Sequence, residues 1–113
     1  MKLEIGKHSF GVNLEEAATT KAIVELLPMS VTMRELNGNE KYYYLNKSLP
    51  SNPQKVKQIN VGDIMLWGND CLVIFYKSFA TPYSYTKIGC ITNPANLQTA
   101  VGEKDVVVKW INN

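Results

Sequence analysis

Short runs in which apolar and polar residues alternate, separated by turn residues, constrain the fold of this chain most strongly. Such runs occupy residues 2–5, 10–14, 29–34 and 40–45, and alternation with a period of two indicates strands with one buried face. Asn37-Gly38 lies between the last two runs. Both of its residues tolerate the positive φ angles of a type I′ hairpin turn. The pattern therefore predicts antiparallel hairpins and a mainly β protein.

Further strands are predicted at residues 64–67, 71–76, 87–91 and 105–111. The run at 71–76, CLVIFY, is nearly all apolar, as expected of a central strand that is covered on both faces. At 113 residues the chain has the usual size of one domain. We therefore expect a single domain over residues 1–113, built as a closed antiparallel barrel.

Two helices are predicted in addition to the strands. Apolar residues between Ala18 and Leu27 recur at helical spacing, which indicates one amphipathic helix over about residues 17–27. Pro28 ends it, because the residue before a proline is pushed out of the helical region. Pro94 and Gly102 favour a short helix over about residues 94–101. We expect the longer helix to lie across one end of the barrel.

The charge pattern argues against nucleic acid as a partner. The net charge is only +2, the lysines are scattered, and Arg34 is the single arginine, whereas binding to phosphates needs clustered basic residues. No stretch approaches the roughly 18 apolar residues that cross a membrane. The N-terminus lacks the apolar core of a signal peptide. The sequence as it stands thus predicts a cytoplasmic protein, or a periplasmic or secreted one if a signal peptide has been removed.

Cys71 and Cys90 are the only cysteines, and His8 is the only histidine. Tetrahedral zinc usually takes four Cys or His ligands, so no metal is expected, and no motif indicates a cofactor. We interpret the cysteines as two buried thiols that behave as small hydrophobic residues. A disulfide is the alternative, and it would need an oxidising compartment.

The sequence also resembles a known family. The residues that carry the resemblance are LNGNEKY at 36–42, Leu49-Pro50, GDIML at 62–66 and LVIFYKSFATPYSYTKIG at 72–89. Together they are similar to the bacterial cyclophilin-like domain family, over nearly the whole chain. This resemblance implies a small barrel related in fold to the cyclophilins and does not by itself imply an activity.

True cyclophilins are peptidyl-prolyl isomerases, and the resemblance makes that activity an alternative to consider. Their catalytic arginine lies in a strand that continues through a Phe-Met-x-Gln run, which is missing here. Arg34 lies in roughly the comparable strand and is the only candidate catalytic residue. The other interpretation of Arg34 is a solvated strand residue paired with Glu35 or Glu40.

Two long segments between predicted strands lack a strand pattern. Residues 46–60 are polar, whereas residues 78–85, SFATPYSY, are aromatic. Loops of this length in compact domains are frequently functional. Apolar rings in a loop either fold back onto the protein or form a binding surface.

The predicted binding residues are Phe79, Tyr83 and Tyr85 of the aromatic segment, together with Tyr44 and Met33. Tyrosine combines a rigid apolar body with a polar tip, which suits the rim of a ligand site. For the tyrosine run at 42–44, ordinary packing within a strand is the alternative. The leading hypothesis is a non-catalytic binding module for a peptide segment or a small molecule. The alternatives are a weak isomerase that uses Arg34 and a structural or oligomerisation domain; the sequence does not define the oligomeric state.

Overall fold

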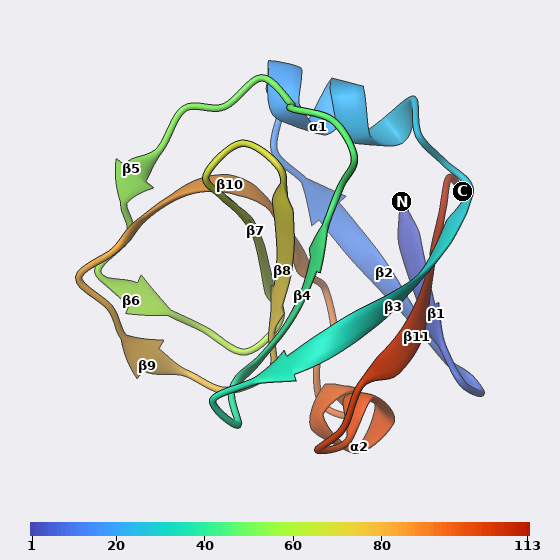
Figure 1. The fold of residues 1–113 in the computed structure, drawn as a ribbon. Coiled ribbons are helices and arrows are strands. Elements are labelled where there is room, and N and C mark those ends of the chain that lie inside the picture. Colours follow the sequence, from blue (N-terminus) through green and yellow to red (C-terminus); the bar gives the residue numbers. More distant parts are fainter.

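The predicted hairpins are present in the computed structural model, which describes residues 1–113, and they close into a barrel (Figure 1). In chain order the elements are β1 (Lys2–Ile5), β2 (His8–Leu14), α1 (Ala18–Val24), β3 (Met29–Leu36), β4 (Glu40–Tyr44), β5 (Gln54–Lys55), β6 (Gln58–Ile59), β7 (Asp63–Trp67), β8 (Cys71–Phe75), β9 (Phe79–Ala80), β10 (Ser84–Ile91), α2 (Leu97–Val101) and β11 (Val106–Ile111). The wall follows the order β2-β1-β11-β3-β4-β8-β7-β10, and the pairing of β10 with β2 closes it. The prediction of a mainly β, closed antiparallel barrel is confirmed.

Turn chemistry explains why the β3–β4 hairpin forms where the sequence predicts it. Asn37 and Gly38 have φ angles of 56° and 68°, the left-handed conformation that a type I′ turn requires. Leu36 and Glu40 face each other across the hairpin. This register fixes which side chains of β4 point out of the barrel.

The interior of the barrel holds the larger of two hydrophobic clusters. Alternation in each strand sends one set of side chains inward, and Leu3, Met33 and Trp110 are among those with no exposed surface. The burial of apolar surface in this cluster is the main force that stabilises the barrel.

Helix α1 lies across one end of the barrel, as expected (Figure 1). Its Ile23 is fully buried in the main cluster. The helix ends at Val24 rather than near residue 27. The N–H groups of Leu26 and Leu27 donate to carbonyls only three residues earlier, so the last turn tightens from an α-helix toward a 3₁₀ arrangement.

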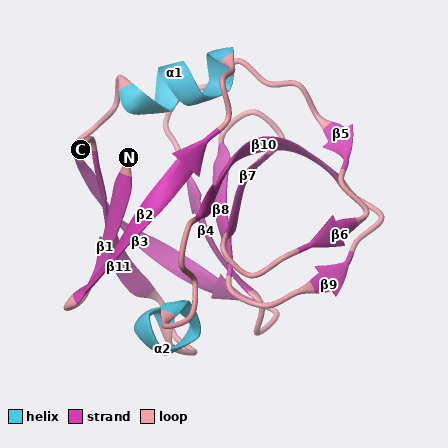
Figure 2. Cartoon of the chain, turned by 180° about the vertical axis from the view of Figure 1, so that it is seen from behind, coloured by secondary structure: helices cyan, strands magenta, loops and turns pink.

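Helix α2 closes part of the other end of the barrel, and Leu97 and Val101 are its buried residues (Figure 2). It begins at Leu97, later than the predicted start near Pro94. The N–H of Leu97 donates to the Pro94 carbonyl at 3.0 Å, so the residues after the proline form a turn. Gly102 follows the helix with a φ of 63°, a conformation that favours glycine.

The two long segments without a predicted strand pattern pair with each other. β5 pairs with the start of β10, and β6 pairs with β9. We call residues 54–59 and 79–85 the outer flap. The flap lies outside the barrel wall, beyond β7 and β8 (Figures 1 and 2). Between flap and wall lies the second hydrophobic cluster, made of Ile59, Met65, Cys71, Val73, Phe75 and Tyr85.

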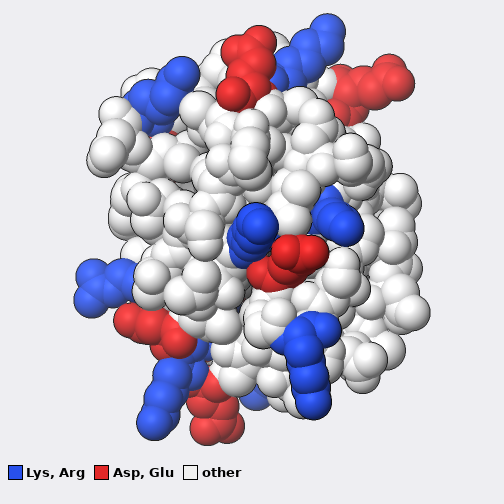
Figure 3. Space-filling model, turned by 90° about the vertical axis from the view of Figure 1, so that its right-hand side faces the viewer, with Lys and Arg blue, Asp and Glu red and all other residues white.

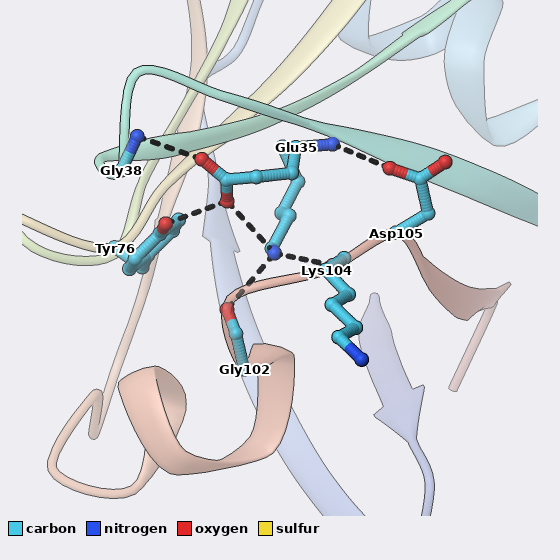
Figure 4. A network of polar contacts seen from close by, with 7 residues as sticks. Glu35, Gly38, Tyr76, Gly102, Lys104 and Asp105 are labelled. Atoms are coloured by element: carbon cyan, nitrogen blue, oxygen red, sulfur yellow. Dashed lines mark hydrogen bonds and ion pairs between the residues drawn. The ribbon is translucent and has the colours of Figure 1, made fainter.

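A buried lysine ties the β3–β4 hairpin to the segment after α2 (Figure 4). Lys41 has no exposed surface. Its Nζ donates to Glu35 Oε1 at 2.9 Å and to the carbonyls of Gly102 and Lys104 at 2.9 and 2.6 Å. Glu35 also accepts from the Tyr76 hydroxyl at 2.6 Å. All three ammonium donors are therefore satisfied, which is what a buried lysine requires.

The two cysteines are free and lie in different environments. Cys71 is buried and Cys90 is exposed. The expectation of two buried thiols is confirmed for Cys71 and wrong for Cys90. Cys90 pairs with Asn13 on β2 and Asp63 on β7, at an exposed position near the end of β10.

Charged side chains of both signs are mixed on one face of the molecule (Figure 3). On the face shown in Figure 3, basic and acidic residues are interspersed, with no continuous patch of one sign. Neither helix has the length and apolar character needed to cross a bilayer.

Candidate functional site

A groove opens on the outside of the barrel, between the β3–β4 hairpin and the outer flap. Its volume is about 410 Å³, within the range of small-molecule sites. The residues that line it are Leu36, Asn37, Glu40, Tyr42, Tyr44, Trp67, Cys71, Val73, Tyr83 and Tyr85. Eight of these ten are hydrophobic, and five of the eight are aromatic. We call this feature the aromatic groove.

The alternation of β4 sets one wall of the groove. Glu40, Tyr42 and Tyr44 point outward, while the side chain of Lys41 lies on the inner face with the carboxyl of Glu35. On the neighbouring strand, Val73 and Cys71 pair with Tyr42 and Tyr44, so their side chains share the outer face. The hairpin register therefore determines that this wall is aromatic.

Trp67 and the flap tyrosines form the opposite wall. The Trp67 ring lies 5.4 Å from the Tyr83 ring and 5.4 Å from the Tyr85 ring, measured between centroids. Tyr85 also contacts Phe75 edge to face at 5.5 Å. Such aromatic contacts contribute roughly 0.5–1.5 kcal/mol each beyond area burial. They hold the wall in place in the absence of a ligand.

The rim of the groove is exposed and the floor is buried. Tyr44, Trp67 and Tyr83 are 55%, 41% and 57% exposed. Below the rim, Val73 on the floor and Tyr85 of the wall are only 2% and 6% exposed. A ligand that enters would cover apolar rings at the rim and contact a closed hydrophobic surface below.

One acidic side chain belongs to this surface. Glu40 is 9% exposed, and neither a hydrogen bond nor an ion pair reaches its carboxyl. Burial, and secondarily the negative charge of Glu35, raises its pKa to about 7. The carboxyl therefore changes its charge near neutral pH.

The thiol in the groove is not activated. Burial raises the pKa of Cys71 to about 11, so the group stays protonated at neutral pH. Since the thiolate is the nucleophilic form, Cys71 serves as an apolar part of the floor. No three His, Cys, Asp or Glu side chains lie together in a way that could hold a metal ion.

The structure brings three of the predicted binding residues together. Tyr44, Tyr83 and Tyr85 all line the aromatic groove. Phe79 lies behind the groove, where its ring packs 5.7 Å from that of Phe75. Met33 is fully buried inside the barrel, so its side chain belongs to the core and not to the groove.

Arg34 lies on the outer face of β3 and pairs with Tyr42 across the hairpin. It is exposed and does not line the groove. It forms no ion pair with Glu35 or Glu40, because the single ion pair of the protein joins Lys41 and Glu35.

Three important lining residues were not predicted: Glu40, Tyr42 and Trp67. The signal for the first two was present, since both lie in phase with Tyr44 in the alternation of β4. Trp67 ends β7 just before a glycine turn. Its role depends on the flap folding back over β7, which no local pattern specifies.

Comparisons with known proteins agree with this architecture. The sequence matches the model of the cyclophilin-like family over residues 3–110. The solution structure of the hypothetical protein AF2241 from Archaeoglobus fulgidus is similar, with a TM-score of 0.65 and 20% sequence identity. The alignment covers 98% of this chain and 92% of that chain. At such identity the likeness concerns the fold alone. No curated protein sequence matches this chain.

Proposed function

The chain belongs to the cyclophilin-like family, and we propose that it is a non-catalytic binding module whose aromatic groove holds a peptide segment or a small molecule. The observation that carries this proposal is the placement of its exposed apolar side chains. Five large hydrophobic residues are exposed, and four of them, Leu36, Tyr44, Trp67 and Tyr83, line this one groove. Exposed apolar groups that cluster in this way typically mark interaction sites.

Rigidity of the groove supports the same proposal. The rings of Trp67 and the flap tyrosines contact each other. In the other wall, the ring centroids of Tyr42 and Tyr44 are 5.8 Å apart. A site that is formed before the ligand arrives loses less conformational entropy on binding.

The position of Arg34 does not support the isomerase alternative. An isomerase would need a cationic group at the base of an apolar groove to stabilise the twisted amide. Here the one charged side chain that lines the groove is the acid Glu40, and Arg34 does not line it. We expect wild type and Arg34→Ala to give the same uncatalysed rate in a prolyl-isomerisation assay. Activity that is lost in Arg34→Ala would overturn the non-catalytic proposal.

Binding is tested with a neutral apolar fluorophore, N-phenyl-1-naphthylamine, titrated into the wild type and three variants. We expect saturable binding that weakens about tenfold in Trp67→Ala and in Tyr83→Ala, because each removes a wall of the groove. Val107→Ala is the matched control, since Val107 is 55% exposed on β11 and does not line the groove. An equal loss in all three variants, or no saturable binding, would contradict the proposal.

The third hypothesis, an oligomerisation surface, is distinguished by sedimentation of the free protein. The binding-module proposal predicts that the wild type and Tyr83→Ala sediment alike. A wild-type dimer that dissociates in Tyr83→Ala would show that the groove is a subunit interface.

A further inference from the structure

The carboxyl of Glu40 lacks a partner within the protein. The Glu40 residue as a whole is 91% buried, the complement of its exposed fraction, and an ionised carboxylate on so enclosed a side chain is unfavourable without a counter-charge. The neighbouring cation, Lys41, binds Glu35 and two carbonyls on the inner face of the sheet. Arg34 is exposed and unpaired. The protein supplies no cation to this carboxyl.

The titratable groups whose charge is coupled to that of Glu40 are all acids. Glu35 from β3, Cys71 from β8, Tyr76 following β8 and Tyr85 from β10 are the groups that act on its charge or respond to it. None of them can offset a negative charge. A positive charge that pairs with this carboxyl would therefore come from outside the chain.

The rings around the carboxyl favour the same kind of charge. The faces of Trp and Tyr rings attract cations within about 6 Å. The one cation–π pair within the protein joins Lys41 and Tyr76, 5.2 Å apart, away from the groove. No lysine or arginine of the chain therefore occupies the rings that line it.

From these three observations we propose that the aromatic groove selects ligands that carry an alkylammonium group, with Glu40 as counter-ion and the rings of Tyr42, Tyr44 and Trp67 as walls. This inference rests on the proposed binding function and assigns its ligand class. The alkyl part of such a ligand would cover Val73 and Cys71 on the floor. The shared chemistry is an aliphatic chain that ends in a positively charged nitrogen, whether in a free amine or in a lysine side chain.

The test compares ligands that differ only in charge. Hexylammonium and 1-hexanol have the same chain length, and their binding is measured by the fluorescence of Trp67; the second tryptophan, Trp110, is fully buried. At about pH 8, where Glu40 is ionised, we expect the wild type to bind the amine about tenfold more tightly than the alcohol. Glu40→Gln should bind both ligands with the affinity of the alcohol. Glu25→Gln, an exposed change of equal charge on the helix side, is the control.

Lowering the pH gives an independent readout. Below its pKa of about 7 Glu40 is protonated in the empty groove, so the preference for the amine should decline by about tenfold per pH unit until it disappears. In Glu40→Gln the ratio of the two affinities should not change with pH. If the preference of the wild type for the amine does not change with pH, another group is the counter-ion. That result would overturn the assignment of Glu40.

The outcomes separate this inference from the proposed function. If hexanol and hexylammonium bind equally to wild type and to Glu40→Gln, the groove binds apolar ligands without selecting charge, and only the inference fails. If neither ligand nor the neutral fluorophore binds, both the inference and the proposed function fail.

A short peptide with one lysine and the same peptide with norleucine in its place show whether a lysine side chain can supply the cation. If the wild type prefers the lysine peptide and Glu40→Gln does not, a lysine side chain supplies the cation. If the wild type prefers hexylammonium over hexanol but does not prefer the lysine peptide, a free amine supplies it.

Discussion

Glu35 and Glu40 lie at the two ends of one hairpin turn, but their carboxyl groups have different partners. For Glu35, burial alone would raise the pKa, but hydrogen bonds from Tyr76, Lys41 and Gly38 outweigh it and lower the pKa. Glu40 receives no such bonds, and its pKa rises to about 7. The first carboxyl is part of the scaffold, whereas the second remains available to a ligand.

The charge of Glu40 should make stability depend on pH. Its folded-state pKa lies above the ordinary value of 4.5 for a glutamate, so between these two values the folded protein holds a proton that the unfolded chain releases. The free energy of unfolding should therefore fall as the pH rises from about 4.5 to about 7, by at most about 3 kcal/mol. In Glu40→Gln this contribution is absent, so the variant should gain stability over the wild type across that range. Urea unfolding at several pH values measures the difference; a difference that is constant with pH would contradict the prediction.

Replacement of Lys41 should destabilise the protein. Lys41→Met leaves the carbonyls of Gly102 and Lys104 without their donor and removes the only cation of Glu35. We expect a loss of about 2–3 kcal/mol, below the usual cost of breaking a fully buried pair, because Glu35 keeps other donors and is partly exposed. Urea unfolding measures it, with Lys109→Met, an exposed lysine on β11, as the control. Equal stability of the two variants would show that the network contributes little.

Among the elements, the outer flap depends on contacts with the wall. Its strands β5, β6 and β9 have two residues each, too few to be stable alone. Ile59, fully buried between β6 and the wall, is the residue that fixes β6 in place. The flap is therefore stabilised by the second cluster and not by its own hydrogen bonds.

Truncation of Ile59 tests this dependence. Ile59→Ala should lower the free energy of unfolding by about 2–4 kcal/mol, as expected for a large buried aliphatic side chain. Hydrogen exchange should accelerate at the Thr81 amide, which donates to the Lys57 carbonyl within the flap. Val107→Ala, on an exposed position of β11, should change neither quantity. Unaltered protection of Thr81 in Ile59→Ala would mean that another contact holds the flap.

The elements also show how far local patterns predict this structure. The strands β1 to β4 and β11 follow from alternation and turn residues, and β7 and β8 follow from apolar runs between turns, because those signals lie within a few neighbouring positions. The flap strands could not be predicted, since their pairing joins segments about twenty to thirty residues apart and their sequences show no apolar alternation. The same reason explains the site: Tyr83 and Tyr85 were recognised as aromatic loop residues, but Glu40 became significant only when the flap placed them opposite it.

At the scale of the whole molecule, closure of the barrel depends on one glycine. Gly89 of β10 pairs with Leu14 of β2 at the seam. A Cβ atom at this position would overlap with the Asn13 carbonyl oxygen, closer than atoms can approach. β10 and β2 can therefore pair only because this residue has no side chain.

Gly89→Ala should consequently disturb the barrel as a unit. We expect the free energy of unfolding to fall by at least about 2 kcal/mol. The new Cβ would clash with a backbone oxygen of Asn13, so β10 and β2 would have to separate. Gly11→Ala is the matched control, since its Cβ would meet only the Thr92 side chain at 3.3 Å. Thermal unfolding of both variants tests the prediction, and a Gly89→Ala protein as stable as Gly11→Ala would contradict it.

The division of the molecule into two hydrophobic clusters has a consequence for its evolution. None of the residues that line the aromatic groove belongs to the cluster inside the barrel. Mutations that reshape the groove therefore leave the barrel interior unchanged, so under the proposed binding function ligand preference can diverge between homologues while the scaffold is inherited intact. The same separation makes the barrel a suitable starting point for engineering new specificities at residues of the rim.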